Sequence, residues 1–547
     1  MVAGDGPRAS SPRLMPQRRS DLDALRGFAM LLGIALHVSL SFFGAPWAVH
    51  DTQRSDLLAL GFAVIHGFRM PLFLLLSGYF TMLVYRRRGL RSLLGQRVSR
   101  IFVPLVISLV TIIPLDSALK AYARRTIPPE PAVAEILSGD EAAVRRRLAE
   151  RGAQGNLDGF FRHTPLGWAT IHGDPAILAA VLDAGADVDE RDDSGNTALH
   201  VVALFGRDGA GRLLLERGAD PLARNVVGRL PAALLAMPAD IVAEAAPFLG
   251  LDALTAEDIL RGRERLRELL PTGPNPQGTY GGPLDRLTLG SWRLLATERL
   301  RIRCGSWSIH LAQTDLFDHL WFLWFLWFLC WLVAIFALLA GAGRLPSGAA
   351  RPWLVASSCL PQAVMGMGTA GFYGPDTSYG IVPQPHLLWY YGCFFFFFGV
   401  ATFAEEGIDT RLGRHFKVLL PAAVLFFVAG IATMNDRLLA TLLQPGYAWT
   451  MSLGLIGFFH RFVSTPGPAA TWLADASYWM YLVHVPLVIS GQLLVRSWPL
   501  PAPLKALVVL AIVTPLLLAS YRFCVRGTAI GRLLNGPREA AVSPPAP

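Results

Sequence analysis

Apolar stretches long enough to cross a membrane recur in two sets along this chain of 547 residues. In lipid only helices and closed barrels satisfy every backbone polar group, and a spanning helix needs about 20 mostly apolar residues. The pattern predicts an all-α fold, a polytopic membrane protein of about ten transmembrane helices. The expected spans are Ala24–Phe43, Leu57–Tyr85, Ile101–Leu119, Phe317–Ala340, Trp353–Phe372, His386–Phe403, Lys417–Met434, Leu438–Phe459, Thr471–Leu494 and Pro503–Phe523.

Composition and charge favour a membrane protein and exclude an ordinary soluble one. Mean hydropathy is +0.41 and only 16% of the residues are charged. The net charge of +9 comes from short arginine clusters between apolar stretches, such as Arg86–Arg88, so a nucleic-acid partner is not expected. Cytoplasmic loops collect Arg and Lys, and the loops between these clusters are almost free of basic residues. The asymmetry predicts cytoplasmic N- and C-termini in a cell membrane.

One ionisable residue, His37, lies inside the first apolar stretch. Such a group is costly in hydrocarbon and normally faces a polar cavity or a partner. Arg26 precedes it by roughly three helical turns, so both side chains project from nearly the same face. This face is a candidate site, with a fixed cation at the membrane surface and a base near the midplane. The structural alternative is a hydrogen bond from His37 to a neighbouring helix.

The segment that carries these two residues, LDALRGFAMLLGIALH, resembles the opening motif of the acyltransferase 3 family. Members of this family are integral membrane proteins that O-acylate carbohydrates. In them an Arg and a His separated by ten residues on the first helix are functionally required. The resemblance therefore implies that Arg26 and His37 are catalytic.

Two further blocks in the first half of the chain resemble the same family. In MPLFLLLSGYF, Met70 to Phe80, Gly78 permits a close helix contact, which we expect beside the first helix. Arg69 precedes this block where family members often carry His. Arg97 and Arg100 form an R-x-x-R pair that could grip the phosphates of an acyl-CoA donor as forked donors. The alternative is that both arginines only anchor the topology.

In the second half, HLWFL from His319 and ASYWMYLVHVPL from Ala476 also resemble family blocks. His319 lies near the outer boundary, within reach of a polar acceptor, and His484 lies deeper. We expect Arg69, His319 and His484 to contact substrate, although a helix-to-helix hydrogen bond is an equal alternative for His484. The sequence shows no metal-ligand spacing, P-loop or Ser/His/Asp arrangement, so no metal cofactor is expected.

A repeat array interrupts the membrane sequence. TPLGWATIHGDPAILAAVLDAGADV begins at Thr164 and TALHVVALFGRDGAGRLLLERGADP at Thr197, a shift of 33 residues. The period and the Gly-Ala-Asp exits resemble the ankyrin repeat. Beyond the array, Leu284–Ile309 mixes Trp and Leu with Arg, as helices in the membrane interface do.

These observations divide the chain into six parts. They are a disordered N-terminal tail (1–19), helices one to three (20–119), ankyrin repeats (131–250), a linker with interfacial helices (251–316), helices four to ten (317–525) and a C-terminal tail (526–547).

The resemblance implies a bacterial inner-membrane enzyme, closest to the glucan-succinylating branch. It would move an acyl group, succinyl or acetyl, from cytoplasmic acyl-CoA to a hydroxyl of an extracytoplasmic carbohydrate. The ankyrin insert, outside the cytoplasm, would bind a partner protein. Two alternatives remain: a transporter or flippase, and an inactive membrane anchor that displays the ankyrin surface.

Overall fold

The computed structural model describes most of residues 19–273, 300–340 and 373–535, with residues 357 and 360. The gaps within these ranges are 44–46, 128–130, 153–163, 193–194, 226–227, 238, 240–241, 244–245, 250, 252, 305–306, 312–313, 375–376, 379, 403–412, 434–436 and 464–466.

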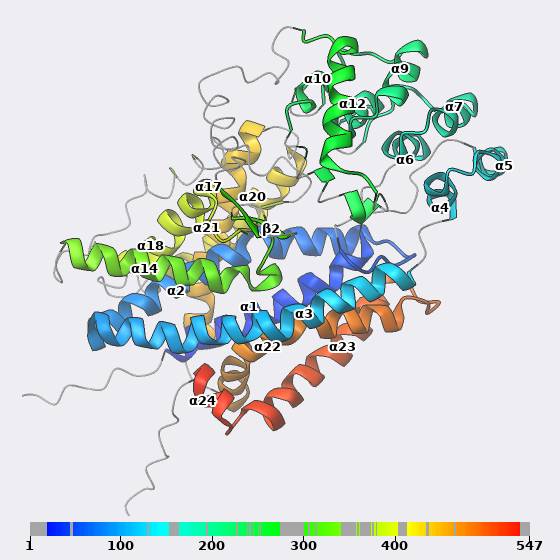
Figure 1. Ribbon diagram of the computed structural model, residues 1–547. Helices are drawn as coiled ribbons and strands as arrows, with labels where there is room; N and C mark the ends of the chain where they lie inside the picture. Colours follow the sequence, from blue (N-terminus) through cyan, green and yellow to red (C-terminus); the bar gives the residue numbers. More distant parts are fainter. Residues whose placement is uncertain are drawn as a thin grey trace, which may run out of the picture.

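Two sets of long helices form one bundle (Figure 1). The first set is α1 (Ser20–Ser39), α2 (Asp56–Arg97) and α3 (Val103–Thr126), with η1 (Leu40–Phe42) after α1 and η2 (Val98–Phe102) before α3. The second set is η5 (Asp318–Leu320), α14 (Trp321–Ala340), α17 (Pro385–Leu387), η6 (Leu388–Phe396), α18 (Phe397–Thr402), η7 (Gly413–His415), α20 (Phe416–Ala432), α21 (Arg437–Phe462), α22 (Pro468–Val495), α23 (Ala502–Ser520), η8 (Tyr521–Val525) and α24 (Ala529–Asn535).

The described residues confirm a helical membrane protein but not the number of spans. Six helical stretches are long and apolar enough to cross a membrane. One of them, Asp56–Ala123, is continuous across two of the expected spans. The expected span Trp353–Phe372 lies outside the described residues. A count of about ten helices therefore stays a prediction.

Helix α1 lies inside the bundle, against α2, α21, α22 and α23. Leu25, Ala29 and Ile34 on α1 are fully buried. The close contact expected at Gly78 exists, but its partner is different from the one predicted. A Cβ at Gly78 would collide with the carbonyl oxygen of Phe396 in η6, so this glycine joins α2 to η6 and not to α1. A Ser-Gly pair predicts close packing but does not identify the helix it meets.

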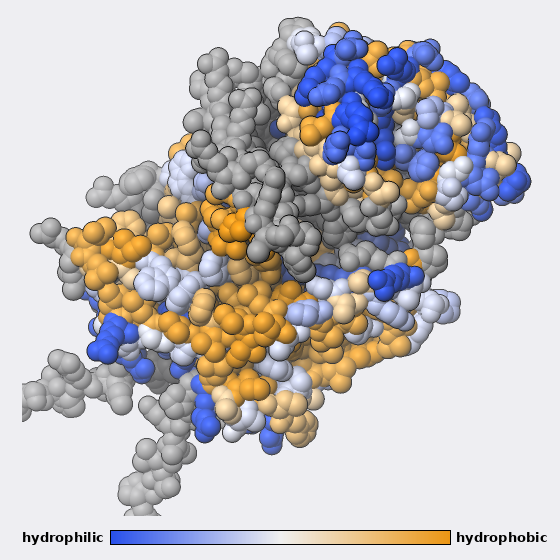
Figure 2. Space-filling model, in the orientation of Figure 1, coloured by the Kyte–Doolittle hydropathy of each residue, from blue (hydrophilic) through white to orange (hydrophobic). Residues whose placement is uncertain are grey.

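The outer surface of the bundle is apolar, as lipid contact requires. Figure 2 shows a mostly hydrophobic face over the bundle and a more hydrophilic one over the insert. Large apolar side chains that are more than half exposed include Val110, Leu338, Leu339, Val418, Leu425 and Phe523. Exposed apolar area of this extent marks an interaction surface, which for these helices is lipid.

The insert forms a separate helical body near the end of α3 (Figure 1). Its helices are α4 (Pro131–Ser138), α5 (Glu141–Arg151), α6 (Pro165–His172), α7 (Pro175–Asp183), α8 (Ala198–Phe205), α9 (Asp208–Glu216), α10 (Pro231–Leu234), η3 (Ala246–Leu249) and α12 (Ala256–Leu269). Thr164 caps α6, and Thr197 forms a capping box with His200 on α8.

Helix α12 packs against this stack. A Cβ on Gly262 would collide with the carbonyl oxygen of Gly206, and buried Arg263 donates to the carbonyl oxygens of Ala203, Leu204 and Met237. The hydrophobic core of the insert accordingly runs from Val133 to Leu270. We propose that the stack includes α12, beyond the expected boundary at residue 250.

The prediction of an interfacial helix at Leu284–Ile309 is wrong for the part of this range that the structure describes. Arg301–Cys304 and Trp307–His310 pair as antiparallel strands β1 and β2, with Ile302 opposite Ile309. Apolar and polar residues alternate along both strands, which favours a hairpin over a helix. Residues 284–299 lie outside the described part of the chain.

Candidate functional site

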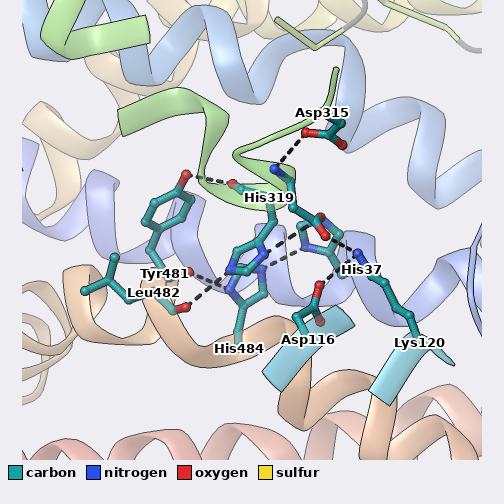
Figure 3. A network of polar contacts seen from close by, with 9 residues as sticks. His37, Asp116, Lys120, Asp315, His319, Tyr481, Leu482 and His484 are labelled. Atoms are coloured by element: carbon teal, nitrogen blue, oxygen red, sulfur yellow. Dashed lines mark hydrogen bonds and ion pairs between the residues drawn. The ribbon is translucent and has the colours of Figure 1, made fainter. Parts of the chain in front are cut away.

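His37 of α1 and His484 of α22 share a hydrogen bond inside the bundle, with 2.8 Å between His37 Nδ1 and His484 Nε2 (Figure 3). His484 Nδ1 lies 2.8 Å from the carbonyl oxygen of Tyr481. A carbonyl oxygen only accepts, so His484 Nδ1 carries its proton, and the Nε2 of neutral His484 is an acceptor. His37 therefore donates from Nδ1, and its Nε2 keeps a lone pair. This pair of bonds makes His37 Nε2 a base.

The two histidines differ in access. His484 is 1% exposed, whereas His37 is half-buried. Among the described residues, no hydrogen-bond partner lies at His37 Nε2. The helix-to-helix hydrogen bond and a functional role are thus compatible for both residues. His484 orients the ring from behind, and His37 presents the base.

His319 in η5 lies on the other side of His484. Its ring centroid is 5.4 Å from that of His484, and its Nε2 donates to the carbonyl oxygen of Leu482 at 3.2 Å. The hydroxyl of Tyr481 donates in return to the carbonyl oxygen of His319 at 2.7 Å. These bonds fasten the segment before α14 to α22 (Figure 3). His319 therefore joins the same cluster as His37, and its expected contact with substrate stays a prediction.

Three charged residues beside this cluster were not predicted from the sequence. Lys120 of α3 pairs with Asp116 at 2.8 Å and with Asp318 of η5. Asp116 is completely buried, and Asp318 has a φ of 48°, the one positive value among the described non-glycine residues. Lys120 and Asp116 lie one turn apart on α3, which is a helical ion-pair spacing. Their partner Asp318 is 198 residues from Lys120, so sequence spacing alone could not find it.

The same residues include the group best placed to hold a metal ion in the described part of the chain. One carboxylate oxygen each of Asp116 and Asp318 and one ring nitrogen of His319 lie within 4.8 Å of one another. The ammonium of Lys120 already pairs with both carboxylates, so the chain supplies its own cation at this position. The expectation of a reaction without a metal stays a prediction.

Arg69 of α2 lies on the inner side of the bundle, near His37. Its Nε is buried and has no hydrogen-bond partner among the described residues. A Cβ on Gly33 would collide with Arg69 Nη1, so the guanidinium rests on α1 one turn before His37. The electrostatic influence of Arg69 reaches His37, His484 and Tyr481. A guanidinium with a free Nε in this part of the structure is suited to an anionic group of a substrate.

The remaining predicted residues meet at the opposite end of the bundle. Arg100 lies close enough to Arg97, Arg88 and Arg26 for their charges to act on it. Arg26 pairs with Asp23 at 3.4 Å, and Arg97 donates to Thr81 Oγ1 at 2.8 Å. Arg26 and His37 share a helix but lie in different clusters. The structure thus separates an arginine cluster (Arg26, Arg88, Arg97, Arg100) from a histidine cluster (His37, His319, His484) that has Arg69 beside it.

Two family models match parts of this chain. The family model described as an acyltransferase domain matches residues 19–139, which contain α1, α2 and α3. Residues 19–139 are therefore similar to an acyltransferase domain. The match includes Arg26, His37 and Arg69 and both arginines of the R-x-x-R pair. The ankyrin resemblance is likewise confirmed, since a model of three ankyrin repeats matches residues 132–225.

Curated relatives of the acyltransferase domain share the first part of the chain. Glucans biosynthesis protein C of Shigella dysenteriae serotype 1 is 39% identical over 99 residues, which are 18% of this chain and 25% of that protein. Glucans biosynthesis protein C of Escherichia coli K12 is 38% identical over the same shares. The match spans about a quarter of the length of these relatives. From outside the matched residues, His484 contacts this segment through its hydrogen bond to His37, and His319 lies against His484.

Proposed function

We propose that this protein is a membrane-bound O-acyltransferase that moves an acyl group from acyl-CoA to a hydroxyl of a carbohydrate. The observation that carries the proposal is the chain of hydrogen bonds from the Tyr481 carbonyl through His484 to His37. The Tyr481 carbonyl fixes the proton of His484, and His484 then leaves the lone pair of His37 on Nε2. A base held in this way suits the removal of a proton from a substrate hydroxyl.

In the reaction, the acceptor hydroxyl gives its proton to His37 Nε2. Its oxygen forms a bond to the thioester carbonyl carbon, the carbon–sulfur bond breaks, and the CoA sulfur takes up a proton and leaves as the thiol. General base catalysis of this kind contributes about 10² to 10⁴ in rate. His484 acts as a positioning residue behind His37, and His319 holds the segment before α14 against it.

The arginine cluster would bind the donor. A nucleotide thioester carries several phosphate charges, and Arg26, Arg97 and Arg100 offer forked donors for them. The charges of Arg26, Arg88 and Arg97 act unfavourably on the Arg100 cation, which favours an anionic ligand beside them. The donor would enter at this end, and its thioester would reach His37 three turns away along α1.

Arg69 would then select the acyl group by its charge. A succinyl group ends in a carboxylate, and a guanidinium whose buried Nε has no hydrogen-bond partner among the described residues suits this charge. The printed names of the relatives concern glucan biosynthesis, so a glucan is the acceptor we propose. Replacing Arg69 by Met should reduce succinyl transfer more than acetyl transfer; equal losses would leave Arg69 without a role in acyl selection.

We further propose the orientation that the charge asymmetry predicts. With both termini in the cytoplasm of a bacterial cell, three spans precede the insert and place the ankyrin stack outside. The donor then enters from the cytoplasm at the arginine cluster, and the glucan enters from the outer side at the histidine cluster. The stack has the two-helix units of a binding surface and would bind a partner protein there.

The test of the function is acyl transfer by the purified chain in lipid nanodiscs. Succinyl-CoA and a linear glucan should together give free CoA and a succinylated glucan, and omission of the glucan should reduce CoA release to background. Movement of the glucan across the bilayer without CoA release would instead favour a transporter. The absence of both activities in a folded protein would favour an inactive membrane anchor.

A further inference from the structure

Gln492 of α22 connects the end of α1 to the segment that follows it. Its side chain is buried, with 1% exposure. Nε2 donates to the carbonyl oxygens of His37 and Val38, each at 3.0 Å, and Oε1 accepts from Trp47 Nε1 at 2.7 Å. Because carbonyls only accept and an indole N–H only donates, these partners fix the orientation of the amide.

Trp47 completes the contact on the ring of His37. Its ring stacks on the imidazole, with 5.7 Å between centroids and an angle of 22° between planes. The segment after Trp47 is fastened nearby: the carbonyl oxygen of His50 accepts from Arg496 at 2.9 Å, and Asp51 forms a buried ion pair with Lys505 at 2.9 Å. Trp47 is thereby held against one face of the base.

The chemistry of a helix end in lipid explains why a glutamine stands here. Helix α1 passes at Ser39 into the tighter turn η1, and carbonyl groups at such a change of helix type lose their regular partners four residues on. No water is available in an apolar interior to satisfy them, so an unpaired carbonyl is costly. The two amide hydrogens of Gln492 serve the carbonyls of His37 and Val38 and so fix the backbone that carries the base.

We propose that Gln492 and Trp47 are positioning residues for acyl transfer, which hold the imidazole of His37 so that Nε2 meets the acceptor hydroxyl. Three contacts then define the base: Gln492 at its backbone, Trp47 on its face and His484 at Nδ1. This inference rests on the proposed role of His37 as base. A misplacement of about 1 Å in such a group can cost about a hundredfold in rate.

The test compares kcat and KM in variants shown to be folded by size-exclusion chromatography and thermal unfolding. Gln492→Leu should lower kcat about ten- to a hundredfold and leave the KM for acyl-CoA unchanged, because the arginine cluster is at the other end of α1. Trp47→Phe keeps a ring on His37 and should lose less activity than Trp47→Leu. The matched control is Gln444→Leu, at a glutamine of α21 that is also 1% exposed and accepts from the Gly374 amide.

Because Gln492 and Trp47 act on the same base, the losses in the double variant Trp47→Leu/Gln492→Leu should be smaller than their product. Wild-type kcat in folded Gln492→Leu, or a change in KM for acyl-CoA alone, would overturn the inference. A His37→Ala variant assayed beside it separates the two claims. If His37→Ala is inactive while Gln492→Leu is normal, the inference fails alone; if His37→Ala is fully active, the proposed base itself fails.

Discussion

The guanidinium of Arg69 rests on Gly33, at the place that a Cβ of residue 33 would occupy. Gly33 is one helical turn before His37, on the same face of α1. The absence of a side chain at residue 33 therefore lets a cation from α2 approach the base of α1. Arg69 and His37 are combined in one site by this close packing.

Gly33→Ala should therefore reduce acyl transfer although alanine favours a helix. The added methyl group would push the Arg69 guanidinium away from the site, and we expect kcat to fall about tenfold, or about 1.4 kcal/mol in the barrier. Turnover of succinyl-CoA by the purified variant measures this. Gly61→Ala on α2 is the control, since open space surrounds Gly61. Equal turnover in both variants would show that the position of Arg69 does not affect acyl transfer.

Arg97 and Arg100 should differ in how they affect the donor. Arg97 already donates to Thr81 Oγ1, whereas Arg100 has like charges around it and no side-chain partner among the described residues. We expect Arg100→Ala to raise the KM for acyl-CoA about ten- to a hundredfold, the cost of one charge-assisted contact of about 1.5–3 kcal/mol. Arg97→Ala should have a smaller effect on KM. Calorimetry with acyl-CoA would contradict this if both variants bind like wild type, which would make the two arginines topology anchors only.

The ankyrin stack should lose stability in mild acid. His200 is fully buried, its Nε2 donates to the Arg229 carbonyl and its Nδ1 accepts from the Thr197 amide, so it is neutral in the fold. Burial lowers the pKa of His200 below its ordinary value of 6.5. Below about pH 6.5 the unfolded chain binds more protons than the folded one, so stability falls as pH falls, by up to about 1.4 kcal/mol per pH unit.

Hydrogen–deuterium exchange of α8 in the full-length chain, corrected for intrinsic rates, measures this loss between pH 7 and pH 5. His200→Gln removes the titrating group but can retain the capping box, so exchange in that variant should depend less on pH. Burial also lowers the pKa of His172, so part of the dependence should remain. The same pH dependence in the variant as in the wild type would show that His200 does not cause it.

The sequence predicts most of the helices and part of the site, for identifiable reasons. Apolar length locates α1, α14 and α22 because lipid imposes it, and a buried ionisable residue such as His37 stands out in an apolar stretch. The bond of His37 to His484 joins residues 447 positions apart. Partners at that distance follow from helix packing, which hydropathy does not define.

The same limit explains the residues that were missed. In the sequence, three charged residues have the pattern of charges at the ends of membrane spans: Lys120, Asp116 and Asp318. Only the fold shows that α3 contacts the segment before α14 and that these charges pair. Gln492 is a polar residue in the apolar stretch LVISGQLLV, which is the signal that could have revealed it. The hairpin β1–β2 was missed because mixed Trp, Leu and Arg composition does not distinguish an interfacial helix from strands when the alternation is short.

The central claim is that His37 removes the proton from the acceptor, and its most direct measurement is mass-spectrometric detection of the acyl ester formed on a glucan by His37→Ala in nanodiscs. Acyl transfer should fall by at least about 10²-fold, while the folded control His386→Ala, at a buried histidine of α17, keeps near-normal transfer. Near-normal ester formation by folded His37→Ala would contradict the account.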